Sequence, residues 1–236
     1  MAAQLCGTLP AMTMKLYMHP VSTASRPVRL FIAEKKLPIE EKVVDLMTGE
    51  NYKDEYTAIN PSRMVPTLVD GDFRLTESSA ILKFLASEAK CPEYPSDLRK
   101  RAKVDEAMDW FNTQFYRDFA YGMLYPQIFP NHKRPTDEAH AGVISWGKEK
   151  AKTWFGVLDK DIIGAHPYVT GDQISIADYF GGCIATAGEL IGCTYEGFPN
   201  VQRWLGNVKK LASWPAINEV MYGFAASLKG KDFVNL

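Results

Sequence analysis

The stretch KLYMHPVSTASRPVRLFIAEKKLPIEEKVVDL at residues 15–46 decides the fold class, because strand and helix signals alternate along it. Residues 15–18 form a short apolar run that predicts a strand. Residues 22–37 carry apolar side chains at helical spacing until Pro38 ends the pattern, and residues 39–46 predict a second strand. A strand, a helix and a strand in this order favour two parallel neighbouring strands joined by a right-handed crossover.

The same α/β pattern continues to residue 87. A polar stretch at 48–57 has weak helical character, and strand candidates at 67–69 and 73–75 flank Asp70-Gly71, a pair suited to a tight hairpin turn. A helix is predicted over 77–87. The expected order of elements is therefore β-α-β-α-β-β-α.

Beyond residue 91 the strand signals end. Two prolines within residues 91–97, CPEYPSD, interrupt any helix and indicate a linker. The later periodic segments are all helical and lie at residues 98–123, 136–162, 175–190, 199–211 and 214–228. The sequence thus predicts an N-terminal extension, an α/β domain, a linker and an all-α domain, at residues 1–13, 14–91, 92–97 and 98–236.

Composition and charge exclude several classes of function. Lys and Arg number 27 against 28 Asp and Glu, and the charges are interspersed, which disfavours a nucleic acid or an anionic membrane as partner. No apolar run approaches the ~18 residues that cross a membrane. The four cysteines (Cys6, Cys91, Cys183 and Cys193) are scattered, with no CxxC pair and no His at metal-ligand spacing. We therefore expect a cytoplasmic protein with reduced thiols and no metal site.

Three segments could carry chemistry, and each also has a purely structural interpretation. Ser22, between the first strand and helix, could cap that helix or donate to an anion at its N-terminus. Val65-Pro66 precedes a strand, and a cis bond there, uncommon in general, would present the Val65 backbone to a peptide-like ligand. Glu77 and Ser78 could cap a helix or bind the amino-acid end of a ligand. Together the three segments suit a small peptide that carries a thiol.

Longer motifs resemble the soluble glutathione transferases, especially the serine-type theta, phi and delta classes and their bacterial relatives. The similar segments are LYMHPVSTASRPVRL at 16–30, NPSRMVPTLVDGDFRLTESSAI at 60–81, VDEAMDW at 104–110, YPQIF at 125–129 and SIADY at 175–179. The resemblance implies a thioredoxin-like N-terminal domain, an all-helical C-terminal domain, a homodimer, and glutathione as co-substrate.

The resemblance also implies roles for individual residues. Ser22 would donate a hydrogen bond to the glutathione sulfur and favour the thiolate, since a free thiol with a pKa of about 8.5 is mostly protonated at neutral pH. Val65 would pair its backbone with the cysteinyl unit beside a cis Pro66. Glu77 and Ser78 would hold the γ-glutamyl end.

Three further positions follow from the resemblance. Arg63 lies near a position that helps to hold the glycyl end, and Asp105 matches an acidic residue that can approach glutathione in the partner subunit of theta-like dimers. Asn51 stands where His is common; it can hydrogen-bond the glycine carboxylate but adds no positive charge. Thr23 stands where beta-class enzymes have cysteine, which argues against glutaredoxin-like chemistry.

An aromatic run from Trp110 to Tyr125 is wider than one helical face needs. Most of it should be core. From the remainder we predict a pocket for an apolar electrophile between the domains, lined by Phe115, Phe119 and Met123.

The sequence therefore predicts a glutathione transferase in which a Ser22-stabilised thiolate attacks small apolar electrophiles. Two alternatives stay open. One is a binding or scaffold module that keeps the fold without chemistry, which the Asn51 substitution slightly favours. The other is an enzyme specialised as a glutathione-dependent dehalogenase, peroxidase or ether lyase.

Overall fold

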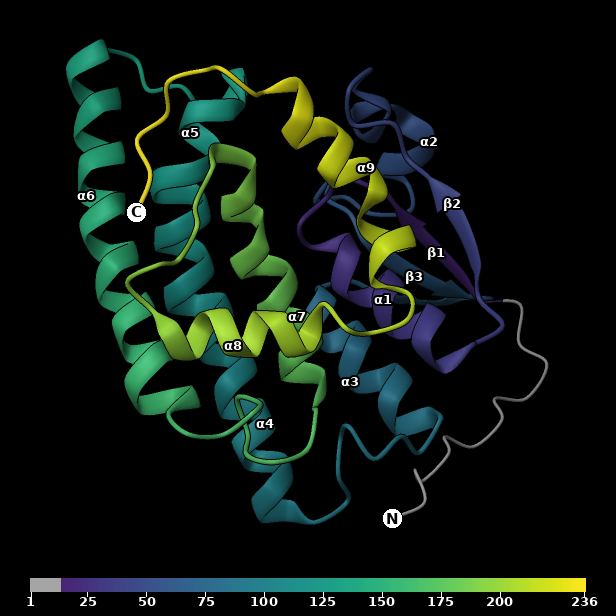
Figure 1. Cartoon of the computed structure of the whole chain (residues 1–236). Coiled ribbons are helices and arrows are strands. Elements are labelled where there is room, and N and C mark those ends of the chain that lie inside the picture. Colours follow the sequence, from purple (N-terminus) through teal and green to yellow (C-terminus); the bar gives the residue numbers. More distant parts are fainter. Residues whose placement is uncertain (1–13) are drawn as a thin grey trace.

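A computed structural model describes residues 14–236, so the extension predicted over residues 1–13 lies outside the described residues. The described chain begins with a four-stranded mixed sheet and continues as an all-helical part (Figure 1). This order confirms the predicted fold class, a thioredoxin-like α/β domain followed by an all-α domain.

The α/β part contains the predicted elements in the predicted order, with one added 3-10 turn. In chain order they are β1 (Lys15–Met18), α1 (Ser25–Lys35), β2 (Glu40–Val43), η1 (Glu50–Tyr52), α2 (Asp54–Thr57), β3 (Thr67–Asp70), β4 (Phe73–Leu75) and α3 (Ser78–Glu88). Helix α1 begins three residues later than predicted. The turn at Ser22 accounts for this, because its carbonyl oxygen accepts hydrogen bonds from the backbone N–H groups of Ser25 and Arg26.

The all-α part consists of helical segments of three kinds. In chain order they are α4 (Leu98–Trp110), η2 (Phe111–Leu124), α5 (Tyr125–Ile128), η3 (Pro130–His132), α6 (Asp137–Val157), η4 (Leu158–Ile163), α7 (Ile176–Ala185), η5 (Thr186–Ile191), α8 (Pro199–Val208) and α9 (Trp214–Ser227). Segments η2 and η4 are π-helical, and η3 and η5 are 3-10. Apolar periodicity located the helices but not these changes of hydrogen-bond register.

The strand order is β2-β1-β3-β4. β1 pairs in parallel with β2 and antiparallel with β3, where Tyr17 lies opposite Thr67, and β4 is antiparallel to β3. Strands β1, β2 and β4 therefore end at the edge of the sheet where β3 begins.

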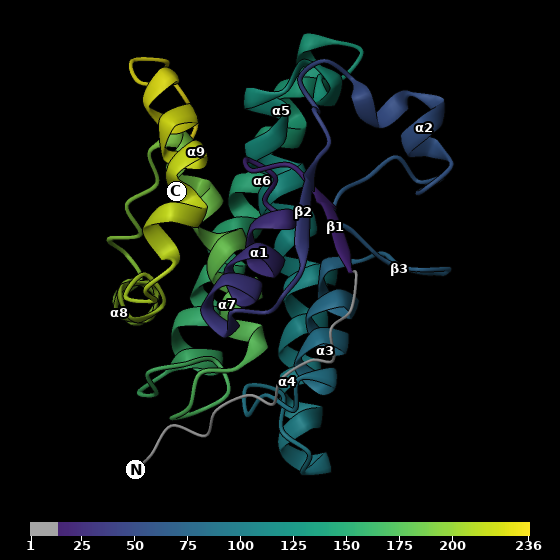
Figure 2. The same ribbon diagram turned by 90° about the vertical axis from the view of Figure 1, so that its right-hand side faces the viewer.

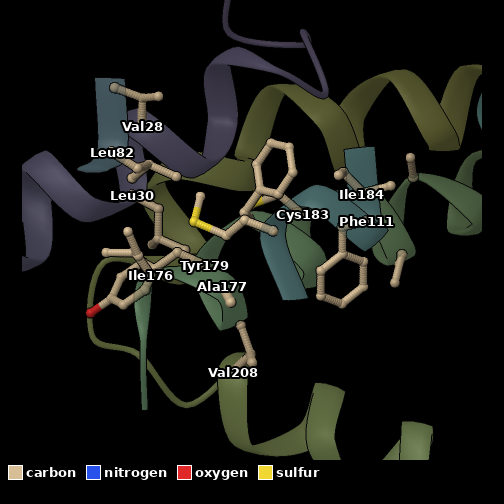
Figure 3. Packing of buried hydrophobic residues seen from close by; sticks show 14 of the residues in the cluster. Val28, Leu30, Leu82, Phe111, Ile176, Ala177, Tyr179, Cys183, Ile184 and Val208 are labelled. Atoms are coloured by element: carbon tan, nitrogen blue, oxygen red, sulfur yellow. The ribbon is translucent and has the colours of Figure 1, made fainter. Parts of the chain in front are cut away.

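Helix α1 lies between the sheet and the all-α part. It packs on α3, α7 and α9, whereas α2 lies on the side of the sheet away from these helices (Figure 2). Figure 3 shows Val28 and Leu30 of α1 and Leu82 of α3 beside Tyr179 and Cys183 of α7, and all five belong to one buried cluster. A shared apolar core thus holds α1 against both parts.

Helix α7 begins with a capping box. Ser175 and Asp178 exchange hydrogen bonds at its first turn. The buried Asp178 carboxylate also accepts from the backbone N–H of Val169 and from Trp204 Nε1, each at 2.9 Å. These bonds fix the start of the helix on which α1 packs.

Of the cysteines in the described chain, Cys183 and Cys193 are free and buried, whereas Cys91 is disulfide-bonded. The expectation of reduced thiols is therefore wrong at Cys91. Within residues 14–236, no helix has both the length and the apolar character to cross a membrane, and no group of His, Cys, Asp and Glu is placed to hold a metal ion.

Candidate functional site

Four segments singled out in the sequence meet at one edge of the sheet. Ser22 follows β1, Asn51 lies in η1 after β2, and Glu77-Ser78 follow β4. Because β3 runs in the opposite direction, Val65-Pro66, just before β3, reach the same edge. The topology thus brings together side chains separated by more than 50 positions.

Ser22 closes the turn between β1 and α1. Its Oγ accepts a hydrogen bond from the backbone N–H of Ser25 at 3.2 Å, so the hydroxyl does act as a cap. A hydroxyl that accepts can still donate its proton, and no acceptor for that proton occurs among the described residues. The backbone N–H groups of Thr23 and Ala24 also have no hydrogen-bond partner there. Three donors therefore remain for an anion at the positive end of α1.

The side chains of Tyr56 and Asn60 support the loop that precedes β3. The Val65-Pro66 peptide bond is cis. The carbonyl oxygen of Met64 accepts from Tyr56 Oη at 2.5 Å and from Asn60 Nδ2 at 2.8 Å. Within residues 14–236, the backbone N–H and carbonyl of Val65 have no hydrogen-bond partner, so they are free to pair with an extended ligand.

The start of α3 offers a second set of free donors. Glu77 has φ 65° and ψ 114°, a left-handed backbone conformation that is unfavourable for a residue with a Cβ and that clusters at ligand sites. Its carboxylate is exposed, and Ser78 is buried. The first internal bond of the helix runs from Ile81 N–H to the Glu77 carbonyl, which leaves the earlier N–H groups of α3 for a ligand.

Asn51 and Arg63 lie next to each other, and a hydrogen bond joins the Asn51 side chain to the Arg63 backbone. Asn51 is 7% exposed, and its Nδ2 donates to the carbonyl oxygen of Arg63 at 2.9 Å. Its Oδ1 has no hydrogen-bond partner among the described residues. The Arg63 guanidinium lies 5.8 Å from the centre of the exposed Tyr52 ring. Asn51 therefore supports the loop, and Arg63 adds a positive charge beside it.

Asp105 bridges the two parts of the chain. Its carboxylate lies 2.9 Å from Lys83 Nζ in α3 and accepts from Tyr94 Oη at 3.0 Å. Asp105 itself lies in α4, so these contacts tie α3 and the linker to the all-α part. The approach of Asp105 to glutathione in a partner subunit stays a prediction.

The three residues predicted to line the electrophile pocket lie in the core instead. Phe115, Phe119 and Met123 are each 0% exposed, and the first two rings pack edge-on against Phe155 of α6 at 4.8 and 5.1 Å. The prediction that they line an open pocket is therefore wrong. Their four-residue spacing puts them on one stripe of η2, and that stripe faces α6.

Tyrosines from the same aromatic run approach the site and were not singled out individually in the sequence. Tyr116 Oη and Tyr125 Oη lie 2.8 Å apart. Burial raises the pKa of Tyr125 to about 12, against the effect of a hydrogen bond with the Thr23 side chain. Burial likewise raises the pKa of Tyr121, and the charge of Glu77 adds to the increase. The excess width of the aromatic run was the only sequence signal for this cluster.

Comparison with known proteins agrees with this geometry. Residues 12–87 match the family profile described as "Glutathione S-transferase, N-terminal domain". The chain is 31% identical over 234 residues to human glutathione S-transferase theta-1, covering 94% of this chain and 92% of that protein.

Solved structures show the same similarity. Human glutathione transferase theta-2, in complex with glutathione and an unknown ligand, superposes with a TM-score of 0.78 at 28% identity, covering 94% of this chain and 93% of that one. A glutathione transferase homologue from Sulfitobacter with bound glutathione gives a TM-score of 0.76 at 25% identity, covering 89% and 98%. This chain therefore belongs to the glutathione S-transferase family and is theta-like.

Proposed function

We propose that this protein is a glutathione transferase in which Ser22 stabilises the thiolate of glutathione for attack on a small apolar electrophile. One observation carries the proposal: the Ser22 hydroxyl proton has no acceptor within residues 14–236 and lies beside the unpartnered N–H groups of Thr23 and Ala24. The two similar structures that contain glutathione support it as the co-substrate.

The proposed chemistry follows from these donors. Hydrogen bonds to the charged form of a group, and the positive end of a helix, both favour an anion, so the thiol loses its proton more readily at Ser22. Each unit of pKa depression corresponds to about 1.4 kcal/mol and to about tenfold more thiolate at a pH well below the pKa. The sulfur then forms a bond to the electrophilic carbon, and the leaving group departs with its electron pair. Holding both reactants in one site supplies the rest of the rate enhancement.

Other residues at this edge would bind the rest of the tripeptide. The free backbone of Val65 would pair with the cysteinyl unit. The γ-glutamyl end would place its carboxylate on the hydroxyl and N–H of Ser78 and its ammonium on Glu77. Arg63 and the second amide proton of Asn51 would hold the glycyl carboxylate.

Ser22→Ala tests the proposal. We expect conjugation of chlorodinitrobenzene to fall by about one to two orders of magnitude, because the donor to the thiolate is lost, while glutathione binding measured by calorimetry changes little. Ser87→Ala, an exposed serine at the end of α3, is the matched control and should conjugate at the wild-type rate. A Ser22→Ala enzyme with wild-type turnover would refute the role of Ser22.

One observation favours the scaffold alternative. The Asn51 amide is engaged with the Arg63 carbonyl and brings no positive charge to the glycyl end. Calorimetry of the wild-type protein separates the two functions, because a scaffold gives no binding heat at millimolar glutathione. A panel of haloalkanes, peroxides and aryl ethers then separates general conjugation from dehalogenase, peroxidase or lyase activity.

We also propose a homodimer. The resemblance to theta-like enzymes supports it, and Met64, Phe73 and Leu98, which are 55%, 46% and 79% exposed, are candidates for the interface. Light scattering on the purified chain measures the mass. We further propose domains at residues 14–91 and 98–236, which limited proteolysis checks. We also propose a location in the cytoplasm, which cell fractionation checks.

A further inference from the structure

Arg26 is the largest charged side chain that the described structure buries completely. It follows Ser22 by one helical turn, and its exposed fraction is 0%. Its Nη1 donates to Asn218 Oδ1 at 2.7 Å and to Thr186 Oγ1 at 3.4 Å, and its Nη2 donates to the carbonyl oxygen of Cys183 at 2.6 Å. The guanidinium is thus solvated by neutral groups of the all-α part.

No carboxylate neutralises this charge in the part of the chain that the structure describes. None of the ion pairs within residues 14–236 includes Arg26. Glu189 lies in the neighbouring segment η5, but it is paired with Lys209 at 2.6 Å. The titratable groups on which the charge of Arg26 acts have pKa values raised by burial and are neutral at neutral pH: Tyr116, Tyr125, Cys183, Tyr195 and Tyr222.

An unneutralised charge in this position acts beyond its contacts. A guanidinium keeps its proton at any pH at which a protein is folded. The amide, hydroxyl and carbonyl oxygens that accept from its Nη1 and Nη2 carry no net charge, and its buried Nε has no hydrogen-bond partner among the described residues. The protein interior screens such a charge weakly. A positive potential therefore extends from Arg26 into its surroundings.

Two contacts connect Arg26 with the Ser22 turn. The backbone N–H of Arg26 donates to the Ser22 carbonyl at 3.0 Å, which ties the two residues together. Tyr125, on which the charge of Arg26 acts, also interacts with the hydroxyl of Thr23, the neighbour of Ser22. The titratable or charged groups on the other side of the turn are His19 and Asp45, after β1 and β2, and Arg29.

We propose that Arg26 is a positioning residue whose unneutralised charge, held in place by Asn218, Thr186 and Cys183, stabilises the glutathione thiolate at Ser22 without touching it. This proposal rests on the proposed function. It differs from a purely structural role, in which Arg26 only ties α1 to α7, η5 and α9.

Asn218→Asp tests the charge while leaving Arg26 in place. The new carboxylate can still accept from Nη1 but neutralises the guanidinium. We expect the thiolate of bound glutathione, followed by its ultraviolet absorbance as pH is varied, to titrate about one unit higher, with about tenfold less thiolate at a pH below both midpoints. The pH profile of kcat/KM should move by the same amount.

Asn218→Ala is the matched control. It loses the same amide, including the bond from Nδ2 to the Trp214 carbonyl, but adds no charge. We expect its thiolate to titrate as in the wild type, even if the thermal midpoint falls. Equal midpoints in Asn218→Asp and Asn218→Ala would overturn the proposal.

Substitution of Arg26 itself gives a second, independent test. Arg26→Lys keeps the charge and should keep the wild-type titration, whereas Arg26→Gln should move it upward by about one unit. Equal titrations in these two variants would also overturn the proposal. If glutathione bound to the wild-type protein titrates like free glutathione, the proposed function itself is wrong. This outcome differs from failure of the Arg26 proposal, because it is seen in the wild type without any variant.

Discussion

Replacing Tyr56 by Phe isolates the support of the Val65 loop. The side chain is 4% exposed, and its hydroxyl contacts the Met64 carbonyl at 2.5 Å and Thr67 Oγ1 at 3.1 Å. Phe keeps the buried ring and loses both contacts. The Met64 carbonyl and Thr67 Oγ1 both still accept from Asn60 Nδ2, at 2.8 and 3.1 Å. The group that loses its partner is the Thr67 hydroxyl proton, which donates to Tyr56 Oη because the single Tyr56 proton is donated to Met64. We therefore expect the free energy of unfolding to fall by only about 1–2 kcal/mol.

The same substitution should weaken glutathione binding. The Tyr56 hydroxyl holds the carbonyl that immediately precedes Val65, and Val65 presents the backbone proposed to pair with the ligand. A loosened loop lowers binding in the ground state and the transition state alike, so KM for glutathione should rise about three- to tenfold with kcat little changed. Steady-state kinetics at saturating electrophile measure both constants.

Tyr195→Phe is the matched control for this prediction. Tyr195 is 5% exposed, and its hydroxyl donates to the Ala185 carbonyl at 2.5 Å inside the all-α part. Its loss should lower stability by a similar amount, about 1–2 kcal/mol, and leave KM for glutathione unchanged. If urea unfolding shows the expected destabilisation in Tyr56→Phe but its KM equals that of Tyr195→Phe, the proposed support of the ligand by this loop is wrong.

Two further predictions concern single side chains near the site. Asn51→His should strengthen glutathione binding several-fold at about pH 6, where an imidazole carries positive charge, and calorimetry that gives equal or weaker binding would contradict this. His19 has a pKa lowered from its ordinary value of 6.5 by burial, so the unfolded chain binds more protons as pH falls through and below that value. The free energy of unfolding should therefore fall on acidification in this window. Urea unfolding at about pH 7.5 and about pH 5.5 should show a smaller fall in His19→Gln than in the wild type. An equal fall in both proteins would show that His19 does not cause this pH dependence.

The sequence predicts the sheet edge well because the signals there are local. Strand periods, the Asp70-Gly71 turn and the proline after α1 each depend on a few adjacent residues. Once these signals fix the order and direction of the strands, Ser22, Val65 and Ser78 can be placed at the same edge. No information on side-chain packing is needed for this step. Local signals were therefore enough to bring these three residues to one edge of the sheet, while their roles stay predictions.

Side-chain partners across the chain could not be predicted in the same way. The burial of Arg26 depends on Cys183, Thr186 and Asn218, which lie 157 to 192 positions away, and no local pattern marks them. The pocket prediction failed for the same reason. A stripe at four-residue spacing shows that Phe115 and Phe119 share a helix face, but only the position of α6 decides whether that face is buried.

The position of α1 makes the Ser22 turn dependent on the all-α part. The Glu34 carboxylate accepts from the backbone N–H of Ser213 at 2.5 Å, just before α9, and Lys35 forms an ion pair with Glu93 in the linker. Arg26 adds its bonds to α7, η5 and α9 near the other end of the helix. A helix fixed to a second domain along its length cannot shift at one end alone. The position of the Ser22 turn therefore depends on contacts in α7, η5 and α9, although none of these contacts is made at the turn itself.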